Sequence, residues 1–318
     1  MDKYSPQQSP VTLRDEDGPA ITRDAEYFEY STAANPIRPS LTPRIPFHFF
    51  SSALYVEGPS RVVPLDMSKA LKCEAPATGP GLCANFVRVV AGDSLVMQPK
   101  STSTVFYVIR GAGSVKAHGA TFEWNEGDFF TAPGVSVIEL KATGDAALYY
   151  VNDAPLLHYL GVEPSVAQFE PTLYRAEKAN AELRIVASQP NAGEKSRVSI
   201  LLGNANFPYT RTVTHVLWAM YGMIGAHTQQ KPHRHQSIAL DFIVDCDKGC
   251  YSLLSKEIDQ DGNMVDPTRV DWETGSAFVT PPGYWHAHFN ESDRDARLIP
   301  IQDAGLQTYL RTLDIRFT

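Results

Sequence analysis

Four of the nine histidines in this 318-residue chain stand in two closely spaced pairs in its C-terminal half. His233 and His235 lie in the segment KPHRHQSIALDFIV, and His286 and His288 lie in TPPGYWHAHFN. Side chains two residues apart on a β-strand point to the same face, so each pair can direct both imidazoles into one barrel. Because converging imidazoles are common ligands of transition metals, the spacing predicts one divalent ion held by His233, His235 and His286.

The alternative is that these are ordinary strand histidines, hydrogen-bonded within the fold or exposed to solvent. That interpretation suits a lone histidine, whereas two H-x-H pairs in one half of the chain favour a metal centre. The other histidines are isolated in the sequence and are interpreted as structural or surface residues: His48, His118, His158, His215 and His227.

The segment around the second pair resembles the second cupin motif, G-x5-P-x-G-x2-H-x3-N, which is matched at every position by Gly275, Pro281, Gly283, His286 and Asn290. Pro281 and Gly283 favour a turn that presents His286 to the barrel interior. The first cupin motif, H-x-H-x4-E, is matched by the other histidine pair, but Leu240 stands where that motif has glutamate. A site of three histidines brings no ligand charge and leaves about three octahedral positions open, as in facial-triad oxygenases.

The elements expected to carry these residues are short β-strands. From about Phe47 onward, β-rich runs alternate with turns rich in Gly, Pro, Asp and Asn, for example STVFYVIRG, ATFEW, DFFTAPG and ALYYV. This pattern is typical of an all-β sandwich or barrel. Helix signals are scarce, and the best candidate is residues 66–73, DMSKALKC, where Asp66 could cap the helix.

The chain also contains an internal repeat. WNEGDFFTAP, with Trp124, matches WETGSAFVTP, with Trp272, and DAPLLHYL, from Asp153, matches DAGLQTYL, from Asp303. We therefore predict two tandem cupin barrels, each a double-stranded β-helix or jelly roll, with few short helices. The expected boundaries are an N-terminal arm over 1–40, a first barrel over 41–165, a linker over 166–189 and a second barrel over 190–318.

The first repeat serves as an internal control for the metal prediction. Superposing VFYVIRG on LDFIVDC puts Gln98 and Lys100 at the positions of the first histidine pair. Counting from the shared proline puts Ile138 and Leu140 at the positions of the second pair. The first barrel is therefore expected to be metal-free, with a structural role or a pocket without metal.

The order H-R-H-x3-A-L-x-F-I, then T-P-x3-W-H-x-H-x-N, resembles the gentisate 1,2-dioxygenase family. The match includes His233, Arg234, His235, Ala239, Leu240, Phe242, Trp285, His286, His288 and Asn290, with Trp218 and Ala219 at the family's distance ahead of them. It extends over most of residues 95–318. Those bicupins cleave aromatic rings with ferrous iron held by three histidines, so the resemblance implies Fe(II), dioxygen and a small aromatic substrate. Manganese, zinc and nickel are the alternative metals.

Two departures from that family bear on the substrate. Asp241 stands where the family has an arginine that grips the substrate carboxylate, and Gly222 stands where it has a glutamine. A carboxylate repels another anion but pairs with an amine or accepts from a hydroxyl. We therefore expect a phenol, hydroquinone or amino-substituted ring rather than gentisate. The alternative for Asp241 is a structural turn or an ion pair with Arg297.

The resemblance suggests that His288 acts as an acid/base or orienting group for a substrate hydroxyl, although it could also be a fourth ligand. Candidate walls of the substrate pocket are Trp218, Tyr284 and Trp285, with plain core packing as the alternative. Asp303 is a further candidate pocket residue, but its repeat partner Asp153 favours a structural role.

Composition narrows the remaining function classes. The formal net charge of -8 argues against a nucleic-acid partner. No apolar run reaches the roughly 18 residues of a membrane span, and the N-terminus lacks a secretory signal, so we expect a cytoplasmic protein without a membrane partner. The four cysteines are too few for a disulfide framework and are interpreted as structural thiols.

Three functions remain open at this point. The first is a metal-dependent ring-cleaving dioxygenase. The second is another cupin enzyme, a decarboxylase, hydrolase or isomerase that uses manganese, zinc or nickel as a Lewis acid. The third is a non-enzymatic bicupin that binds a small molecule. Because barrels of this kind cover exposed sheet edges by associating, we expect a homodimer or homotetramer.

Overall fold

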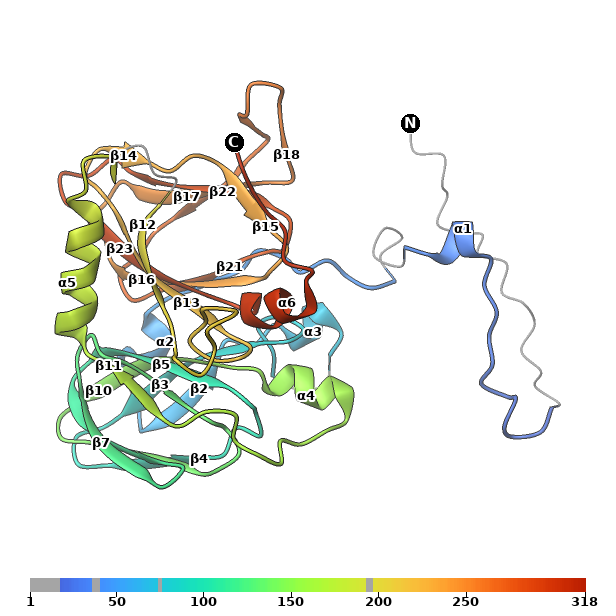
Figure 1. Cartoon of the computed structure of the whole chain (residues 1–318), viewed down its shortest axis with the longest axis horizontal. Coiled ribbons are helices and arrows are strands. Elements are labelled where there is room, and N and C mark those ends of the chain that lie inside the picture. The colour runs from blue at the N-terminus through green and yellow to red at the C-terminus, as the bar shows by residue number, and fades with distance from the viewer. Residues whose placement is uncertain (1–17, 36–40, 74–75, 193–196) are drawn as a thin grey trace.

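The duplicated β-rich segments form two barrels, as Figure 1 shows. The computed structural model describes residues 18–35, 41–73, 76–192 and 197–318. The predicted all-β fold with few short helices is confirmed, because the longest helix within these ranges has 12 residues.

The first barrel consists of a six-stranded and a four-stranded sheet. The larger sheet has the order β11-β8-β5-β10-β3-β2, made of β2 (Arg61–Pro64), β3 (Cys83–Val89), β5 (Thr104–Arg110), β8 (Phe129–Ala132), β10 (Ala146–Asn152) and β11 (Thr172–Tyr174). The smaller sheet has the order β4-β9-β6-β7, made of β4 (Ser94–Met97), β6 (Ala112–Ala117), β7 (Ala120–Asn125) and β9 (Ile138–Ala142).

The second barrel repeats this plan with two six-stranded sheets. One sheet has the order β1-β21-β16-β23-β13-β12, made of β1 (Phe49–Phe50), β12 (Val198–Leu202), β13 (Trp218–Ile224), β16 (Ala239–Asp245), β21 (Ala277–Thr280) and β23 (Ala296–Gln302). The other contains β14 (Thr228–Gln229), β15 (His233–His235), β17 (Cys250–Ser255), β20 (Thr268–Asp271), β22 (Trp285–Asn290) and β24 (Ile315–Phe317). A small hairpin of β18 (Glu257–Ile258) and β19 (Met264–Val265) projects beside them.

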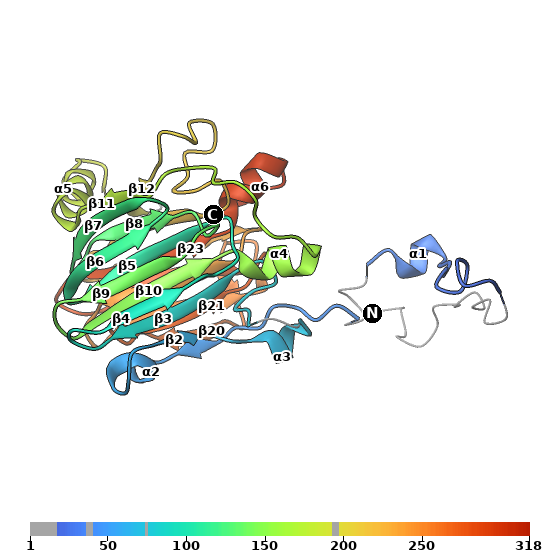
Figure 2. The same ribbon diagram turned by 90° about the horizontal axis from the view of Figure 1, so that it is seen from below.

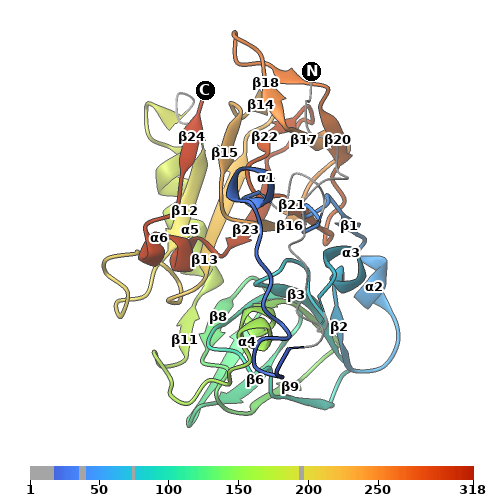
Figure 3. The ribbon, with the colours of Figure 1, turned by 90° about the vertical axis from the view of Figure 1, so that its right-hand side faces the viewer.

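The two barrels pack together through their β5- and β16-containing sheets (Figure 3). Tyr149 of the first barrel stacks on Phe242 of the second, with ring centroids 4.9 Å apart, and Tyr107 lies against the same phenylalanine. Burial of these large apolar rings is the main stabilising contribution at this interface. Each barrel also has its own apolar interior, which includes Phe106 in the first barrel and Ile243 in the second.

The sequence repeat corresponds to equivalent elements in space. The second part of each repeat forms a short helix, α4 (Ala154–Leu160) in the first barrel and α6 (Ala304–Leu310) in the second. The aspartate before each helix accepts a backbone hydrogen bond from the residues that lead into the central strand. Asp153 accepts from the amides of Thr102 and Ser103 at 2.9 Å, and Asp303 accepts from the amide of Ile238 at 3.1 Å.

The remaining helices are α1 (Tyr30–Ala33), α2 (Ala53–Val56), α3 (Ser68–Leu71) and α5 (Ala176–Ala187). The helix expected over 66–73 is present as α3, and the Asp66 carboxylate accepts from the amide of Ser68 at 2.9 Å. Helix α5 lies in the segment predicted to be a linker. It packs on β12 and β13 through Ala179 and Leu183, which stand four residues apart and so share one face. Because only these two positions of α5 are buried, the segment resembles a polar linker in sequence.

Two short strands cross the expected domain boundaries. Phe49–Phe50, in the range expected for the first barrel, pairs with β21 of the second barrel. Thr172–Tyr174, in the range expected for the linker, pairs with β8 of the first barrel. The two sheets that contain β16 and β5 therefore each take an edge strand from outside the expected range, which covers backbone groups that would otherwise be exposed.

The described part of the expected N-terminal arm, residues 18–35, lies away from both barrels in Figure 1. Residues 1–17 and 36–40 of that arm lie outside the described ranges. Within those ranges no helix is long and apolar enough to cross a membrane, and the four cysteines form no disulfide. The cytoplasmic location and the homo-oligomeric state stay predictions.

Candidate metal centre

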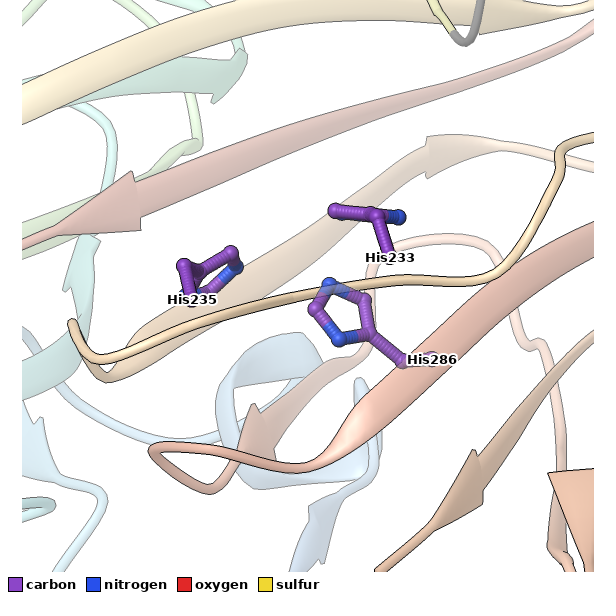
Figure 4. Close-up of side chains that lie close together, drawn as sticks. All are labelled: His233, His235 and His286. Atoms are coloured by element: carbon purple, nitrogen blue, oxygen red, sulfur yellow. The ribbon is translucent and has the colours of Figure 1, made fainter. Parts of the chain in front are cut away.

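Three of the predicted histidines meet inside the second barrel. β15 and β22 are antiparallel partners, and His233 lies directly opposite His286. One ring nitrogen from each of His233, His235 and His286 lies within 4.8 Å of the other two, and all three side chains are buried. Figure 4 shows the rings gathered at one point, so the predicted cluster forms from two neighbouring strands.

A turn between β21 and β22 sets the position of His286. The Tyr284 amide donates to the Pro281 carbonyl at 3.3 Å, and Gly283 adopts a φ of +76°, a conformation that favours glycine. The Gly283 amide also donates to the His235 carbonyl at 2.8 Å. The cupin-like turn thus ties the end of β15 to the start of β22 and holds the two histidine strands together.

Backbone carbonyls orient two of the rings. His286 Nδ1 lies 3.0 Å from the Tyr284 carbonyl, and His235 Nδ1 lies 2.8 Å from the Ser237 carbonyl. A carbonyl only accepts, so each Nδ1 carries the hydrogen and each Nε2 presents its lone pair. His235 Nε2 is buried and has no hydrogen-bond partner in the described part of the chain. These tautomers fit a metal ligand whose second nitrogen is fixed by the fold.

The electrostatic environment keeps these rings neutral. Burial, together with the nearby Arg197 guanidinium, lowers the pKa of His235 to about 4. Burial also holds the pKa values of His233 and His286 well below the ordinary value. Desolvation disfavours the imidazolium form, and a metal ion requires the neutral ring. The donor set therefore fits a divalent transition ion.

Arg197, immediately before β12, is a site residue that sequence reasoning missed. Its guanidinium hydrogen-bonds with His233 Nε2, and its Nη2 lies 3.4 Å from His286 Nε2. Burial lowers the pKa of Arg197 to about 10, and the carboxylate of Asp241 opposes that shift. Because the guanidinium takes lone pairs that a metal would need, it must move aside when an ion binds. Its position before the apolar run VSILL gave a weak signal that it begins a strand.

His288 lies outside the group of three ligand atoms. Its buried ring has Nδ1 2.7 Å from the Ser252 hydroxyl oxygen, which also accepts from Trp272 Nε1 at 2.8 Å. The Ser252 hydrogen is satisfied if it is donated to Nδ1, which places the ring hydrogen on Nε2. That nitrogen has no protein partner within the described ranges. His288 is thus arranged as an oriented donor beside the three histidines.

Asp241 is buried on β16, and Thr280 donates a hydrogen bond to its carboxylate at 2.6 Å. Burial raises the pKa of Asp241 to about 6, although Thr280 and Arg197 oppose the shift. The ion pair considered for this residue is not formed, since Arg297 pairs with Asp245 at 2.6 Å instead. The structure therefore places a buried carboxyl group in the barrel, within the electrostatic influence of Arg197.

The predicted aromatic walls are only partly assembled. Trp218 begins β13, and its buried indole Nε1 has no hydrogen-bond partner among the described residues. Trp285 alternates with His286 along β22 and lies against the Arg234 guanidinium, 5.5 Å from the ring centroid, so it faces away from the histidines. The Tyr284 side chain lines a separate hollow of about 520 Å³ with Leu254.

Asp303 is placed as a structural residue. Its carboxylate accepts from the Ile238 amide and lies 3.2 Å from the Gln307 side-chain nitrogen, and burial raises its pKa to about 6. These contacts hold the turn before β16. The equivalent bonds of Asp153 in the first barrel match this arrangement, which favours the structural role for Asp303.

The first barrel differs slightly from the sequence superposition. Met97 lies opposite Ile138, just as His233 lies opposite His286, so Met97 rather than Gln98 takes the place of the first histidine. The reason is that the first barrel has one residue more between this position and its next strand. The corresponding position on β9, Ile138, is the one that the sequence predicted.

Comparison with known proteins agrees with this geometry. No family model matches the chain. It is 30% identical over 124 residues to gentisate 1,2-dioxygenase 1 of Aquipseudomonas alcaligenes, which covers 39% of this chain and 32% of that protein. It is 33% identical over 72 residues to 5-aminosalicylate 1,2-dioxygenase of a Comamonas species, which covers 22% of this chain and 19% of that protein. The matched segments thus span a third or less of these curated relatives.

The fold similarity extends over nearly the whole chain. Salicylate 1,2-dioxygenase from Pseudaminobacter salicylatoxidans superposes with a TM-score of 0.69 at 13% sequence identity, covering 91% of this chain and 93% of that one. At this identity the comparison concerns the fold. By its fold the chain is a two-barrel protein similar to salicylate 1,2-dioxygenase, and by its local sequence matches it resembles gentisate 1,2-dioxygenase 1 and 5-aminosalicylate 1,2-dioxygenase.

Proposed function

We propose that this protein is an Fe(II)-dependent ring-cleaving dioxygenase that acts on a small hydroxylated or amino-substituted aromatic. The observation that carries the proposal is the meeting of three buried, neutral imidazoles without a carboxylate ligand. The similarity to gentisate and 5-aminosalicylate 1,2-dioxygenases supports the same reaction class.

His233, His235 and His286 would hold the ion through their ring nitrogens. When bound, a ferrous ion supplies open coordination positions at which a substrate hydroxyl and dioxygen can meet. A manganese, zinc or nickel ion in the same cage would instead serve a Lewis-acid enzyme, so the identity of the metal separates this proposal from the second function class.

Residues of the chain would position the substrate beside the ion. His288 presents an Nε2 that the Ser252–Trp272 chain of hydrogen bonds leaves free to donate to a substrate oxygen. Trp218 presents its indole Nε1 from β13, and its ring offers an apolar wall. We assign His288 the role of orienting a substrate hydroxyl and exchanging its proton.

Charge inside the barrel bears on the choice of substrate. Asp241 favours an amino or hydroxyl substituent and repels a carboxylate, which argues against gentisate. Arg197, immediately before β12, attracts a carboxylate. We retain an amino- or hydroxyl-substituted ring as the preferred substrate, and gentisate turnover is the direct test of which charge dominates.

The experiment is oxygen uptake by the purified, iron-loaded chain with a panel of hydroxy- and amino-substituted aromatics. The panel contains 5-aminosalicylate, gentisate, salicylate, hydroquinone and 4-aminophenol. The proposal predicts oxygen consumption and loss of ring absorbance with at least one member, and slower turnover of gentisate than of the preferred compound. Turnover that is independent of oxygen, or that requires zinc or manganese, would replace the dioxygenase with another cupin enzyme.

A further inference from the structure

The first barrel contains a cavity that the proposed reaction does not use. Its volume is about 440 Å³, within the range of small-molecule sites. Its walls include Cys83 and Asn85 on β3, Tyr150 and Asn152 on β10, and Met97 at the end of β4. Figure 2 shows α4 at the end of these strands, where the chain leaves β10.

This cavity occupies the place in the first barrel that the histidine cluster and Trp218 occupy in the second. Met97 takes the register position of His233, as described above. Cys83 pairs with Asn152 across β3 and β10, and Trp218 pairs with Gln302 across the equivalent strands β13 and β23. The cavity of the first barrel therefore lies at the end that corresponds to the histidine cluster, and the first barrel has no histidine at these register positions.

A buried hydroxyl group in this cavity has no acceptor for its hydrogen. Tyr150 is 3% exposed, its ring stacks on Phe106 with centroids 4.4 Å apart, and its Oη donates no hydrogen bond to the described residues. Burial holds the pKa of Tyr150 well above its ordinary value, although the Asn152 side chain opposes that shift by donating to the oxygen, so the hydroxyl stays protonated and can donate. Buried polar groups are nearly always satisfied, and this one lines a space large enough for a ligand.

The other polar groups favour a neutral ligand. Burial raises the pKa of the Cys83 thiol to about 12, so the thiol is uncharged. At the mouth, Lys100 pairs with Glu163 at 2.5 Å, which leaves no unbalanced charge there. The Asn152 side-chain oxygen accepts from the Ala154 amide at 3.0 Å, and its side-chain amide is directed to Tyr150. The Tyr150 hydroxyl is therefore a neutral donor in a largely apolar cavity, which suits an oxygen acceptor on a ring.

We propose that the first barrel is a second small-molecule site, which binds a neutral, mainly apolar ring compound whose oxygen accepts a hydrogen bond from Tyr150. The site needs no metal, and it stands on the geometry of the first barrel whether or not the second barrel is a dioxygenase.

Fluorine NMR titration of the full chain tests the proposal with two probes. 4-Fluoroacetophenone carries an oxygen acceptor, and fluorobenzene is a similar ring without one. Tyr150→Phe should weaken binding of the ketone by roughly five- to ten-fold, the contribution of one hydrogen bond, and change that of fluorobenzene less than about two-fold. Tyr107→Phe, which alters a buried tyrosine outside the cavity, should change neither affinity.

A second variant assigns the binding to this cavity. Ala154 lines the cavity at the start of α4, so Ala154→Phe should fill it and abolish binding of both probes. His286→Ala, in the other barrel, should leave both affinities unchanged. Absence of binding to the wild-type chain at millimolar probe would overturn the proposal. So would unchanged binding in Ala154→Phe, or equal effects of Tyr150→Phe on the two probes.

Discussion

Phe106 and Asp241 occupy equivalent positions in the two barrels, and only Asp241 brings a charged group inside. Phe106 pairs with Phe130 on β8, and Asp241 pairs with Phe278 on the equivalent strand β21. The Phe106 ring is stacked between Phe130 and Tyr150, at 4.6 and 4.4 Å. An aromatic stack thus occupies the position in the first barrel where the second holds a carboxyl group. Because functional groups often lower stability, we expect Asp241 to destabilise the second barrel.

Asp241→Asn should stabilise the protein at neutral pH. The folded-state pKa of about 6 lies above the ordinary value of 3.8, so the native state holds more protons between these values. The contribution of Asp241 to the free energy of unfolding is therefore largest below about pH 4, falls as the pH rises through about 6, and stays low above it. The variant lacks this slope and should gain about 1–3 kcal/mol at pH 7, as measured by urea unfolding.

Asp303 also makes the unfolding free energy depend on pH, but it does so equally in wild type and Asp241→Asn. The difference between the two proteins from pH 5 to 7 therefore reports on Asp241. The same variant should lose turnover of the preferred amino- or hydroxyl-substituted substrate. If the unfolding free energy had the same pH dependence in both proteins, the raised pKa of the buried Asp241 carboxyl group would be refuted.

Arg197→Met should increase metal affinity by roughly ten-fold or more. The guanidinium hydrogen-bonds with His233 Nε2, so an ion and Arg197 compete for one lone pair, and two cations repel each other. Competition with a chelator for Zn²⁺ measures the change. Arg234→Met is the matched control, since that guanidinium lies over Trp285 on the outer face. Weaker metal binding by Arg197→Met would contradict the competition.

Ser252→Ala should reduce kcat/KM by roughly ten-fold without changing metal content. The substitution removes the partner of His288 Nδ1 and frees the ring to change tautomer. Ser252→Thr keeps the hydroxyl and should restore most of the activity. Ser255→Ala, on the same strand, removes a hydroxyl that bonds the Glu257 carbonyl instead and should have little effect. Loss of metal from Ser252→Ala would show that His288 is a ligand.

Gly283→Ala should weaken metal binding and lower stability by about 1 kcal/mol. Its φ of +76° is strained for alanine, and its amide holds the His235 carbonyl. Gly161→Ala offers a matched control, because Gly161 has a φ of +65° at the end of α4, with open space around it. The two variants should lose similar stability in thermal unfolding. If both variants bound metal with equal affinity, the prediction that the Gly283 turn supports the metal centre would be wrong.

The histidine cluster could be predicted from sequence because its information is local. A spacing of two residues becomes a shared strand face, and the Pro281–Gly283 turn follows from backbone preferences. The repeat then extended this reasoning to a second barrel, and the fold prediction was confirmed. The same period-two rule places Trp285 opposite His286, so this candidate wall could have been excluded from the sequence as well.

Arg197 depends instead on long-range pairing. It approaches the histidines because β12 pairs with β13, and no local spacing links it to His233. The strands β1 and β11 likewise pair with strands that are distant in sequence. A strand of two or three residues is too short to show an alternating pattern of apolar and polar residues. Such contacts are fixed by tertiary packing, which residue types alone do not encode.

Anaerobic metal analysis of the full chain loaded with Fe(II) tests the central claim most directly. We expect one ferrous ion per chain in the wild type, almost none in His286→Ala, and full retention in His215→Ala, a partly buried histidine outside the cluster. Retention of the ion by His286→Ala at the wild-type level, or failure of the wild type to bind iron at all, would contradict the account.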